Sequence, residues 1–329
     1  MAEPVIVVAG AGAIGCFVGG LLAAAGRDVR LLARARGVDE IKAHGLTLSD
    51  FDGLEARSTP EVTQAPEVLA EADIVLVCVK GGASAEMGQL VARHAPERAV
   101  VVSLQNGLTP VEVLRRALPG RDVRAGMVGF NVVAQGQGRY HRSASGEMMV
   151  EAGPGELGAL LSVPGLEVEE RADMAEVQRG KLILNLTNAV NALSGKSLRD
   201  MLLDRGWRRV MAAQMREALA VFKAARLEVR VPAAAPAWAI PTILRLPTWA
   251  FRRVAAPMLT VDASARTSMV VDLESGKKTE IGLFQGEIVR LGQMHGVATP
   301  VNARVADLVA EAEVGGIRQV RSADILAVV

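Results

Sequence analysis

Short apolar runs alternate with helical patterns through the first third of the chain. Residues 4–9, 28–33, 73–79 and 98–104 are rich in valine, isoleucine and leucine, as in strands that are buried on both faces. Helical patterns fall between these runs, including an alanine-rich one that ends near Gly26 and one over residues 83–94. This alternation predicts an α/β fold with a doubly wound, largely parallel sheet.

The pattern changes twice further along the chain. Residues 123–153 contain apolar runs interrupted by glycines, which predicts an antiparallel edge that closes the first domain. After Asp173 the strand signals stop, and helical patterns cover residues 174–194, 199–226, 264–274 and 279–295. We therefore predict a first domain over 1–173 and an all-α C-terminal domain over 174–329, which agrees with the usual size of domains.

Two apolar stretches resemble membrane spans. Residues 5–26 lack charge, but no basic residue precedes the stretch and several glycines interrupt it. Residues 231–258 are interrupted by Arg245 and by prolines that include Pro232, Pro236, Pro241 and Pro247, so we interpret the segment as a surface-packing connector, either a lid or a dimer contact. No membrane association is expected, and whether two copies form a homodimer is left open.

Charge and cysteine content narrow the class of ligand. Lys and Arg total 37 against 36 for Asp and Glu, so no general field recruits nucleic acid or an anionic membrane surface. The two cysteines and four histidines lack the spacing of a metal site, and no metal is expected. These features favour a reduced, cytoplasmic protein that binds a small molecule.

A glycine-rich turn follows the first predicted strand. Its G-x-G-x-x-G pattern occupies Gly10, Ala11, Gly12, Ala13, Ile14 and Gly15. In such turns the first glycine allows a tight bend, the second lets the backbone approach a pyrophosphate, and the third lets helix and strand pack closely. With a strand before it and a helix after it, the motif predicts a Rossmann-type dinucleotide-binding domain.

The end of the second strand predicts which dinucleotide binds. NAD enzymes place an acidic residue there to bind the ribose, whereas this chain has Arg34, followed by Arg36. An arginine at this point favours a 2′-phosphate, and therefore NADPH. The alternative is that both arginines are ordinary solvated surface residues.

Two polar residues follow later strands of the sheet. Lys80 and Asn106 lie just past the carboxyl ends of strands, where open α/β sheets bind their ligands. They are candidates for contact with cofactor or substrate. The alternatives are a solvated lysine at a strand end and a plain Asn-Gly turn.

The first helix of the second domain carries a polar stripe. Lys181, Asn185 and Asn188 are spaced i, i+4 and i+7 on a helix whose other residues are mostly apolar. Such a stripe faces either solvent or a polar site. Glu280 is a further candidate, although Thr279-Glu280 also fits a helix cap followed by an acidic first turn.

Taken in order, these segments resemble the ketopantoate reductase (2-dehydropantoate 2-reductase) family over nearly the whole chain. The resemblance comprises the glycine motif, Val79-Lys80-Gly81, Gln105-Asn106-Gly107, Lys181-x-x-x-Asn185, and Ser268-Met269-x-x-Asp272 leading to Thr279-Glu280-Ile281. It implies NADPH-dependent reduction of 2-dehydropantoate to (R)-pantoate, on the route to pantothenate and coenzyme A.

The resemblance also implies residue roles. Lys181 is the expected catalytic proton donor and Glu280 a functional glutamate, while Ser268 would bind the substrate carboxylate. Asn185 matches the family's first substrate-binding asparagine, and Asn106 would lie at the nicotinamide end. The active site is expected in a cleft between the domains, with Gly12 and Lys181 on opposite walls.

One departure from the family pattern leaves the substrate open. The second asparagine, expected eight residues after the lysine, is Ala189 here, and Asn188 stands one position earlier. Two alternatives therefore remain: a paralogous reductase of another 2-keto acid, and a non-catalytic NADPH-binding sensor.

Overall fold

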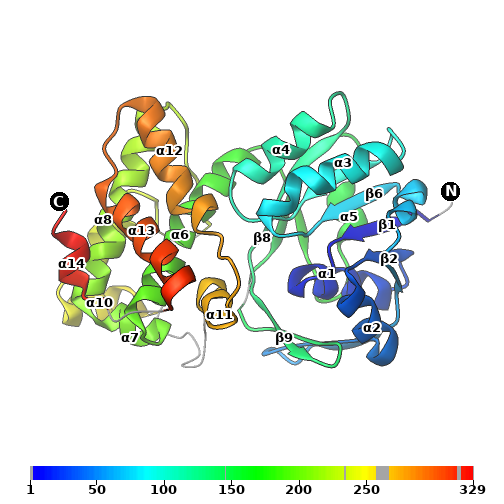
Figure 1. The fold of residues 1–329 in the computed structure, drawn as a ribbon, viewed down its shortest axis with the longest axis horizontal. Helices are drawn as coiled ribbons and strands as arrows, with labels where there is room; N and C mark the ends of the chain where they lie inside the picture. Colours follow the sequence, from blue (N-terminus) through cyan, green and yellow to red (C-terminus); the bar gives the residue numbers. More distant parts are fainter. Residues whose placement is uncertain (1–2, 145, 233–234, 257–266, 317–319, 329) are drawn as a thin grey trace. The chain divides into compact units, whose positions relative to one another are not determined.

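The computed structural model describes residues 3–144, 146–232, 235–256, 267–316 and 320–328 (Figure 1). The chain forms two compact units, Met1–Met174 and Ala175–Val329. Within the described residues, no helix is both long enough and apolar enough to cross a bilayer. The two units are described separately below.

The first unit is built on an eight-stranded sheet. Its strand order is β12-β11-β8-β7-β6-β1-β2-β5, and the run from β8 to β5 is parallel throughout. The strands are β1 (Ile6–Ala9), β2 (Val29–Leu32), β5 (Glu61–Thr63), β6 (Ile74–Val77), β7 (Val100–Ser103), β8 (Val123–Val128), β11 (Met148–Glu151) and β12 (Val168–Arg171). Because β1 and β6 are buried at every residue, the predicted two-sided burial is correct. The Rossmann-type α/β class is confirmed.

The antiparallel edge predicted over residues 123–153 is only partly correct. Strand β11 does pair antiparallel with β8 at that side of the sheet. The hairpin between them, β9 (Val132–Gly136) and β10 (Arg139–Arg142), instead joins β3 (Leu46–Asp50) and β4 (Glu55–Ser58) in a second sheet of order β4-β3-β10-β9. Local sequence pattern missed this pairing because β10 lies parallel to β3, some 90 residues earlier in the chain.

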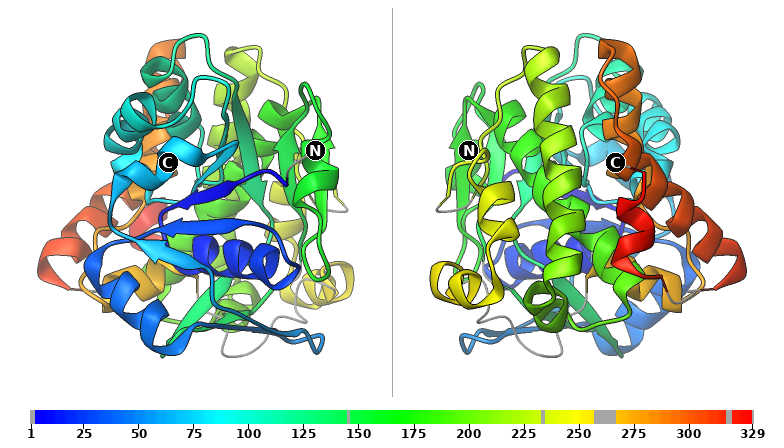
Figure 2. Two further views of the ribbon diagram at one scale, coloured as in Figure 1. Left: turned by 90° about the vertical axis from the view of Figure 1, so that its right-hand side faces the viewer. Right: turned by 90° about the vertical axis from the view of Figure 1, so that its left-hand side faces the viewer.

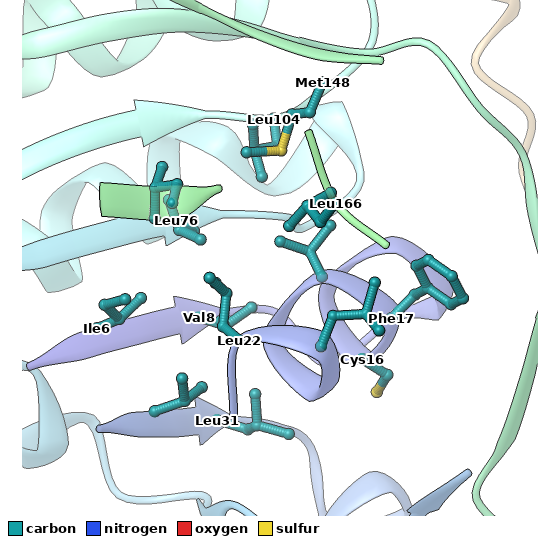
Figure 3. Packing of buried hydrophobic residues seen from close by; sticks show 14 of the residues in the cluster. Ile6, Val8, Cys16, Phe17, Leu22, Leu31, Leu76, Leu104, Met148 and Leu166 are labelled. Atoms are coloured by element: carbon teal, nitrogen blue, oxygen red, sulfur yellow. The ribbon is translucent and has the colours of Figure 1, made fainter. Parts of the chain in front are cut away.

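Helix α1 (Ala13–Ala24) is covered by both sheets, which explains why its sequence is apolar on all sides. A side chain at Gly19 would clash with Leu31 and Val8 of the large sheet, whereas one at Gly20 would clash with Leu48 and Leu46 of the small sheet. Figure 2 (left) shows α1 in dark blue near the strands, and Figure 3 shows Leu22 beside Val8 of β1, with Phe17 on the other side of the helix. The uncharged stretch over residues 5–26, which resembles a membrane span, therefore belongs largely to the hydrophobic core of the first unit.

The remaining helices of the first unit complete the alternation of strands and helices. They are α2 (Ala35–His44), α3 (Ser84–His94), α4 (Thr109–Ala117) and α5 (Leu157–Leu161), with short 3-10 turns η1 (Pro66–Glu71) and η2 (Gly81–Ala83). Helices α3 and α4 pack against each other, and η2 leads directly into α3. The loop that carries Lys80 is thus short and held at both ends.

The described residues of the second unit contain helices and no strand, which confirms the predicted all-α class. The helices are α6 (Met174–Ser194), α7 (Leu198–Leu203), α8 (Arg205–Ala224), α9 (Ile240–Arg245), α10 (Thr248–Val254), α11 (Ser268–Glu274), η4 (Ile281–Leu283), α12 (Gln285–His295), α13 (Pro300–Gly315) and α14 (Ser322–Leu326). Helix α8 contacts α7, α9, α12, α13 and α14, and so forms the centre of the unit (Figure 2, right).

Some helical predictions need correction. The pattern over 199–226 is two helices, because Asp204 ends α7 and its side chain accepts the amide of Gly206 as the N-cap of α8. The pattern over 279–295 is likewise interrupted at Phe284, between η4 and α12. Residues 264–266 of the predicted 264–274 helix lie outside the described residues, and α13 and α14 were not predicted.

The proline-interrupted segment 231–258 is organised by one buried arginine. Its described part contains α9 and α10, and residues 233–234 and 257–258 lie outside the description. Arg208 of α8 is fully buried and donates hydrogen bonds to the carbonyls of Leu202, Leu244 and Leu246, at 2.9 to 3.0 Å. Its guanidinium also lies 4.3 Å from the ring centroid of Phe251. Burial lowers the pKa of Arg208.

We predict that Arg208→Met destabilises the protein by several kcal/mol, since the buried carbonyls of Leu202 and Leu244 lose their donors at about 1 to 3 kcal/mol each and the half-buried carbonyl of Leu246 also loses its donor. Arg209→Met, at an exposed position on the same helix, is the matched control and should change stability by less than about 0.5 kcal/mol. Urea denaturation of both variants measures the difference. Equal free energies of unfolding for the two variants would contradict the assigned role of Arg208.

Candidate active site

The glycine loop is shaped by two contacts that leave no room for side chains. Gly10 has a φ of +112°, and a Cβ there would lie 2.7 Å from the amide nitrogen of Val79. A Cβ on Gly15 would lie 2.1 Å from the carbonyl oxygen of Gly10. The start of α1 is therefore packed directly onto the end of β1.

Gly12 differs from its neighbours because it faces open space. It is exposed, a Cβ built on it meets nothing within 4 Å, and it is the N-cap of α1 without a side-chain cap. The first amides of the helix are thus accessible from the side where the backbone is bare, as binding of a pyrophosphate requires. These residues fit a dinucleotide.

Arg34 lies beside this loop. Ala9 and Leu32 are partners in the β1–β2 ladder, and the Gly10 amide donates to the Leu32 carbonyl at 3.0 Å. Arg34 follows as the exposed N-cap of α2, whose first turn contains no acidic residue. The loop after β2 therefore carries Arg34 at the place where NAD enzymes carry a carboxylate that binds the ribose.

The loops with Lys80 and Asn106 belong to the same edge of the sheet. The Cys78 amide donates to the Ala9 carbonyl at 2.9 Å, and the Leu104 amide donates to the Val77 carbonyl at 3.0 Å. Strands β1, β6 and β7 are consecutive in the sheet, so the glycine loop, the Lys80 loop and the Asn106 loop are neighbours. Lys80 is exposed and Asn106 is half-buried.

The Asn-Gly turn is real, because Gly107 has a φ of +88°. A turn here does not exclude a binding role, since it brings Asn106 to the edge where ligands bind. The preceding residue, Gln105, is buried and donates a hydrogen bond to the Lys80 loop. The sequence did not predict this bond, although Gln105 belongs to the family motif Gln105-Asn106-Gly107.

The polar stripe of α6 lies on the less buried side of that helix. Lys181, Asn185 and Asn188 are each half-buried, while Leu182, Ile183, Leu186, Ala189 and Val190 are almost fully buried. The stripe is not an ordinary solvated face, because none of its three members is exposed. Gln178, three residues before Lys181, extends it and was not predicted.

A close chain contact fixes α6 next to Lys181. A Cβ on Gly180 would lie 2.1 Å from the carbonyl oxygen of Arg230, so only glycine fits there. The Arg179 side chain donates to the Glu228 carbonyl at 2.6 Å, and the Arg230 amide donates to the Glu176 carbonyl at 3.1 Å. The chain after α8 therefore lies along α6 and sets the position of the lysine.

The electrostatic environment of Lys181 suits a proton donor. Burial lowers the pKa of Lys181 to about 8, and the negative charge of Glu280 opposes part of that decrease. Such an ammonium is still mostly protonated near neutral pH and releases its proton more readily than a solvated lysine. Among the predicted site residues, Glu280 thus acts on Lys181 through its charge.

Glu280 is not in the first turn of a long helix. It precedes the three-residue turn η4, and α12 begins only at Gln285. Thr279 donates through its amide and hydroxyl to Glu313 of α13, at 2.8 and 2.7 Å, and its hydroxyl accepts the Ile281 amide. The polar partners of Thr279 hold the backbone beside Glu280. Glu280 is the N-cap residue of η4 but makes no capping hydrogen bond through its side chain.

Ser268 is the exposed first residue of α11 and is positioned by the residue before it. The buried Thr267 hydroxyl lies 3.2 Å from the Asn191 side-chain oxygen and 3.5 Å from the Asn188 carbonyl, both on α6. Thr267 therefore ties the start of α11 to the helix that carries Lys181. In the described parts of the chain, no group of three or more His, Cys, Asp or Glu could hold a metal ion.

Comparison with known proteins identifies the family. The family model described as "Ketopantoate reductase PanE/ApbA" matches residues 6–155, and its C-terminal counterpart matches residues 173–313. The chain belongs to the ketopantoate reductase family. Its members are oxidoreductases, which agrees with a fold and a glycine loop suited to a nicotinamide cofactor.

Individual relatives span nearly the whole chain. The 2-dehydropantoate 2-reductase of Halobacterium salinarum is 28% identical over 94% of this chain and 99% of its own length. A solved PanE/ApbA family ketopantoate reductase from Ralstonia eutropha is 30% identical with a TM-score of 0.80, covering 94% and 98% of the two chains. A D-mandelate dehydrogenase solved with NADH and anilino(oxo)acetate shares the fold, with a TM-score of 0.78 at 22% identity over 94% and 98%.

The pairing of Lys181 with Glu280 predicts a measurable titration. Lys181 should titrate with a pKa of about 8, followed by NMR of ¹³C-methylated lysines in the ligand-free protein. Because the Glu280 carboxylate raises this pKa, Glu280→Gln should lower it further. Lys223→Arg, which removes an exposed lysine of α8, assigns a control resonance. A Lys181 pKa near 10.5 would contradict the burial argument, and an unchanged value in Glu280→Gln would contradict the pairing.

Proposed function

We propose that this chain reduces 2-dehydropantoate to (R)-pantoate with NADPH, as an enzyme of pantothenate and coenzyme A biosynthesis. The observation that carries the proposal is a half-buried lysine with a lowered pKa, next to a glutamate, in a chain whose relatives are 2-dehydropantoate 2-reductases over nearly their full length. A sensor without turnover is not carried forward, because the family consists of oxidoreductases.

Residues 1–173 would bind the cofactor in this proposal. The accessible helix N-terminus at Gly12 would hold the pyrophosphate, and Arg34 would pair with the 2′-phosphate that distinguishes NADPH from NADH. Lys80 and Asn106, on the two adjacent loops, would contact the remainder of the cofactor. The absence of an acidic residue in the first turn of α2 removes the usual ribose ligand of NAD enzymes.

Residues 174–329 would bind the keto acid and supply the proton. A nicotinamide bound by the first unit would supply a hydride to the ketone carbon, and negative charge would then develop on the carbonyl oxygen. The Lys181 ammonium stabilises that oxygen and donates the proton that completes the hydroxyl group. Glu280 keeps enough protonated lysine available at neutral pH by opposing the effect of burial.

The other polar residues would orient the substrate. Ser268, which follows the Thr267 that is held against α6, would bind the carboxylate. Asn185 and Asn188 lie on the same side of α6 as Lys181 and would bind hydroxyl or carbonyl oxygens, with Asn106 as a contact from the cofactor domain. This arrangement requires Gly12 and Lys181 to face each other across an interdomain cleft, which stays a prediction.

A 2-keto acid other than 2-dehydropantoate remains an alternative substrate, because Ala189 stands where the family has its second asparagine. Its side chain is fully buried and cannot take the role of the family's second asparagine. Asn188 is half-buried on the side of Lys181 and is the available replacement. Steady-state kinetics with 2-dehydropantoate beside a panel of 2-keto acids decides between the two substrates by kcat/KM.

Replacing the proposed acid tests the mechanism. We expect Lys181→Ala to lower kcat by about a hundred- to ten-thousand-fold, the usual contribution of a general acid, with NADPH affinity nearly unchanged. In the unmodified enzyme, kcat should fall as pH rises through the lysine pKa, because only the protonated amine donates. Lys223→Ala is the control for loss of an exposed lysine. Near-normal turnover in Lys181→Ala would assign the proton to another group.

Replacing the proposed phosphate ligand tests the cofactor. NADPH should bind more tightly than NADH, and Arg34→Ala should narrow the difference by about 1.5 to 3 kcal/mol, the range of a charged hydrogen bond. Arg93→Ala, an exposed arginine at the end of α3, should leave the difference unchanged. Isothermal titration with both cofactors measures this. Equal affinity of the unmodified protein for NADPH and NADH would refute the proposal.

A further inference from the structure

The loops that carry Lys80 and Asn106 extend beyond the last paired residues of their strands. In the β6–β7 ladder the final partners are Val77 and Ser103, and the last backbone bond across is from Leu104 to Val77. Past that point, side chains join the two loops. Gln105 is one residue that does so.

Gln105 is 6% exposed and makes three hydrogen bonds. Its side-chain nitrogen donates to the Val79 carbonyl at 2.9 Å and to the Ser84 hydroxyl at 2.8 Å. Its side-chain oxygen accepts the Ser103 hydroxyl at 3.1 Å. The Ser84 hydroxyl in turn donates to the Gly81 carbonyl at 2.7 Å.

The direction of each bond is set by chemistry. The Val79 and Gly81 carbonyls can only accept, so the amide NH₂ must face Val79 and the Ser84 proton must point to Gly81. The side-chain oxygen of Gln105 then faces Ser103 and accepts the proton of its hydroxyl. Ser84 and Ser103 are each 1% exposed, so the bonds that Gln105 makes with these two hydroxyls are buried and are strengthened by the low dielectric there.

We propose that Gln105 is a positioning residue that fixes the spacing between Lys80 and Asn106 and so preorganises the cofactor edge of the sheet. The carbonyls it holds directly and through Ser84 belong to Val79 and Gly81, the residues on either side of Lys80. Its own backbone continues into Asn106. This inference rests on the proposed function for the identity of the cofactor, but the network stands independently of the substrate.

A purely structural role makes a different prediction. The ladder between β6 and β7 holds the sheet without Gln105, so loss of its amide should affect the loops more than the fold. A buried glutamine that serves only packing should lower stability and leave ligand affinity unchanged. Gln214 on α8 provides such a comparison, because it is fully buried and hydrogen-bonded within the helical unit.

The test compares Gln105→Met with Gln214→Met in the full-length protein. Both changes keep the side-chain length and remove the amide. We expect Gln105→Met to raise the Kd for NADPH by about tenfold and to raise the KM for 2-dehydropantoate, as lost hydrogen bonds at a binding site do. Gln214→Met should lower the thermal midpoint but hold the Kd within about twofold. Fluorescence titration, steady-state kinetics and thermal denaturation give the three readouts.

Two milder variants cover the case in which Gln105→Met does not fold. Ser103→Ala removes one bond of the network, whereas Ser84→Ala removes two, the one from Gln105 and the one to Gly81. Ser84→Ala should therefore raise the Kd for NADPH more. Unchanged NADPH affinity in all variants, with lowered thermal midpoints, would overturn the inference. Weakened NADPH binding in a protein that fails to reduce 2-dehydropantoate would support Gln105 and refute the proposed substrate instead.

Discussion

The first unit depends on one close contact, in which the start of α1 packs onto the end of β1 without space for a side chain. A Cβ on Gly15 would lie 2.1 Å from the Gly10 carbonyl oxygen, so any other residue would push the helix away from the sheet. This contact keeps the amides at Gly12 level with the ends of β2, β6 and β7. The parallel sheet then brings Arg34, the Lys80 loop and the Asn106 loop to the same edge. The side chain of Gln105 joins the last two of these loops.

The second unit keeps Lys181 partly buried while its amine stays mostly protonated at neutral pH. The apolar side of α6 is buried in the helical core, so Lys181 lies on the remaining face, and the chain passing over Gly180 covers that helix further. Two neighbouring segments are then anchored independently: Thr267 ties Ser268 to α6, and Glu313 holds Thr279 beside Glu280. Because these anchors come from different helices, the site is a product of the whole unit.

Where the sequence interpretation succeeded, the signal was local. The strands β1, β2, β6 and β7 and the helix α6 have strong patterns of consecutive residues, and each was predicted close to its observed bounds. The second sheet was missed because its strands are short, partly exposed and paired across distant parts of the chain, as β10 with β3. The breaks at Asp204 and Phe284 escaped because helical periodicity continues across them, while tertiary packing turns the chain.

The sequence by itself determined the glycine spacing, the missing acid after β2 and the single polar face of Lys181, Asn185 and Asn188, because each depends only on positions along one strand, turn or helix. Only the tertiary structure decided that the pKa of Lys181 is lowered to about 8, that Glu280 acts on it, and that Gln105 joins the Lys80 loop to Asn106. Those properties arise from burial and from partners far apart in the chain, such as Gln105 and Val79 or Lys181 and Glu280. No local pattern encodes such distances, since they exist only once the core has packed.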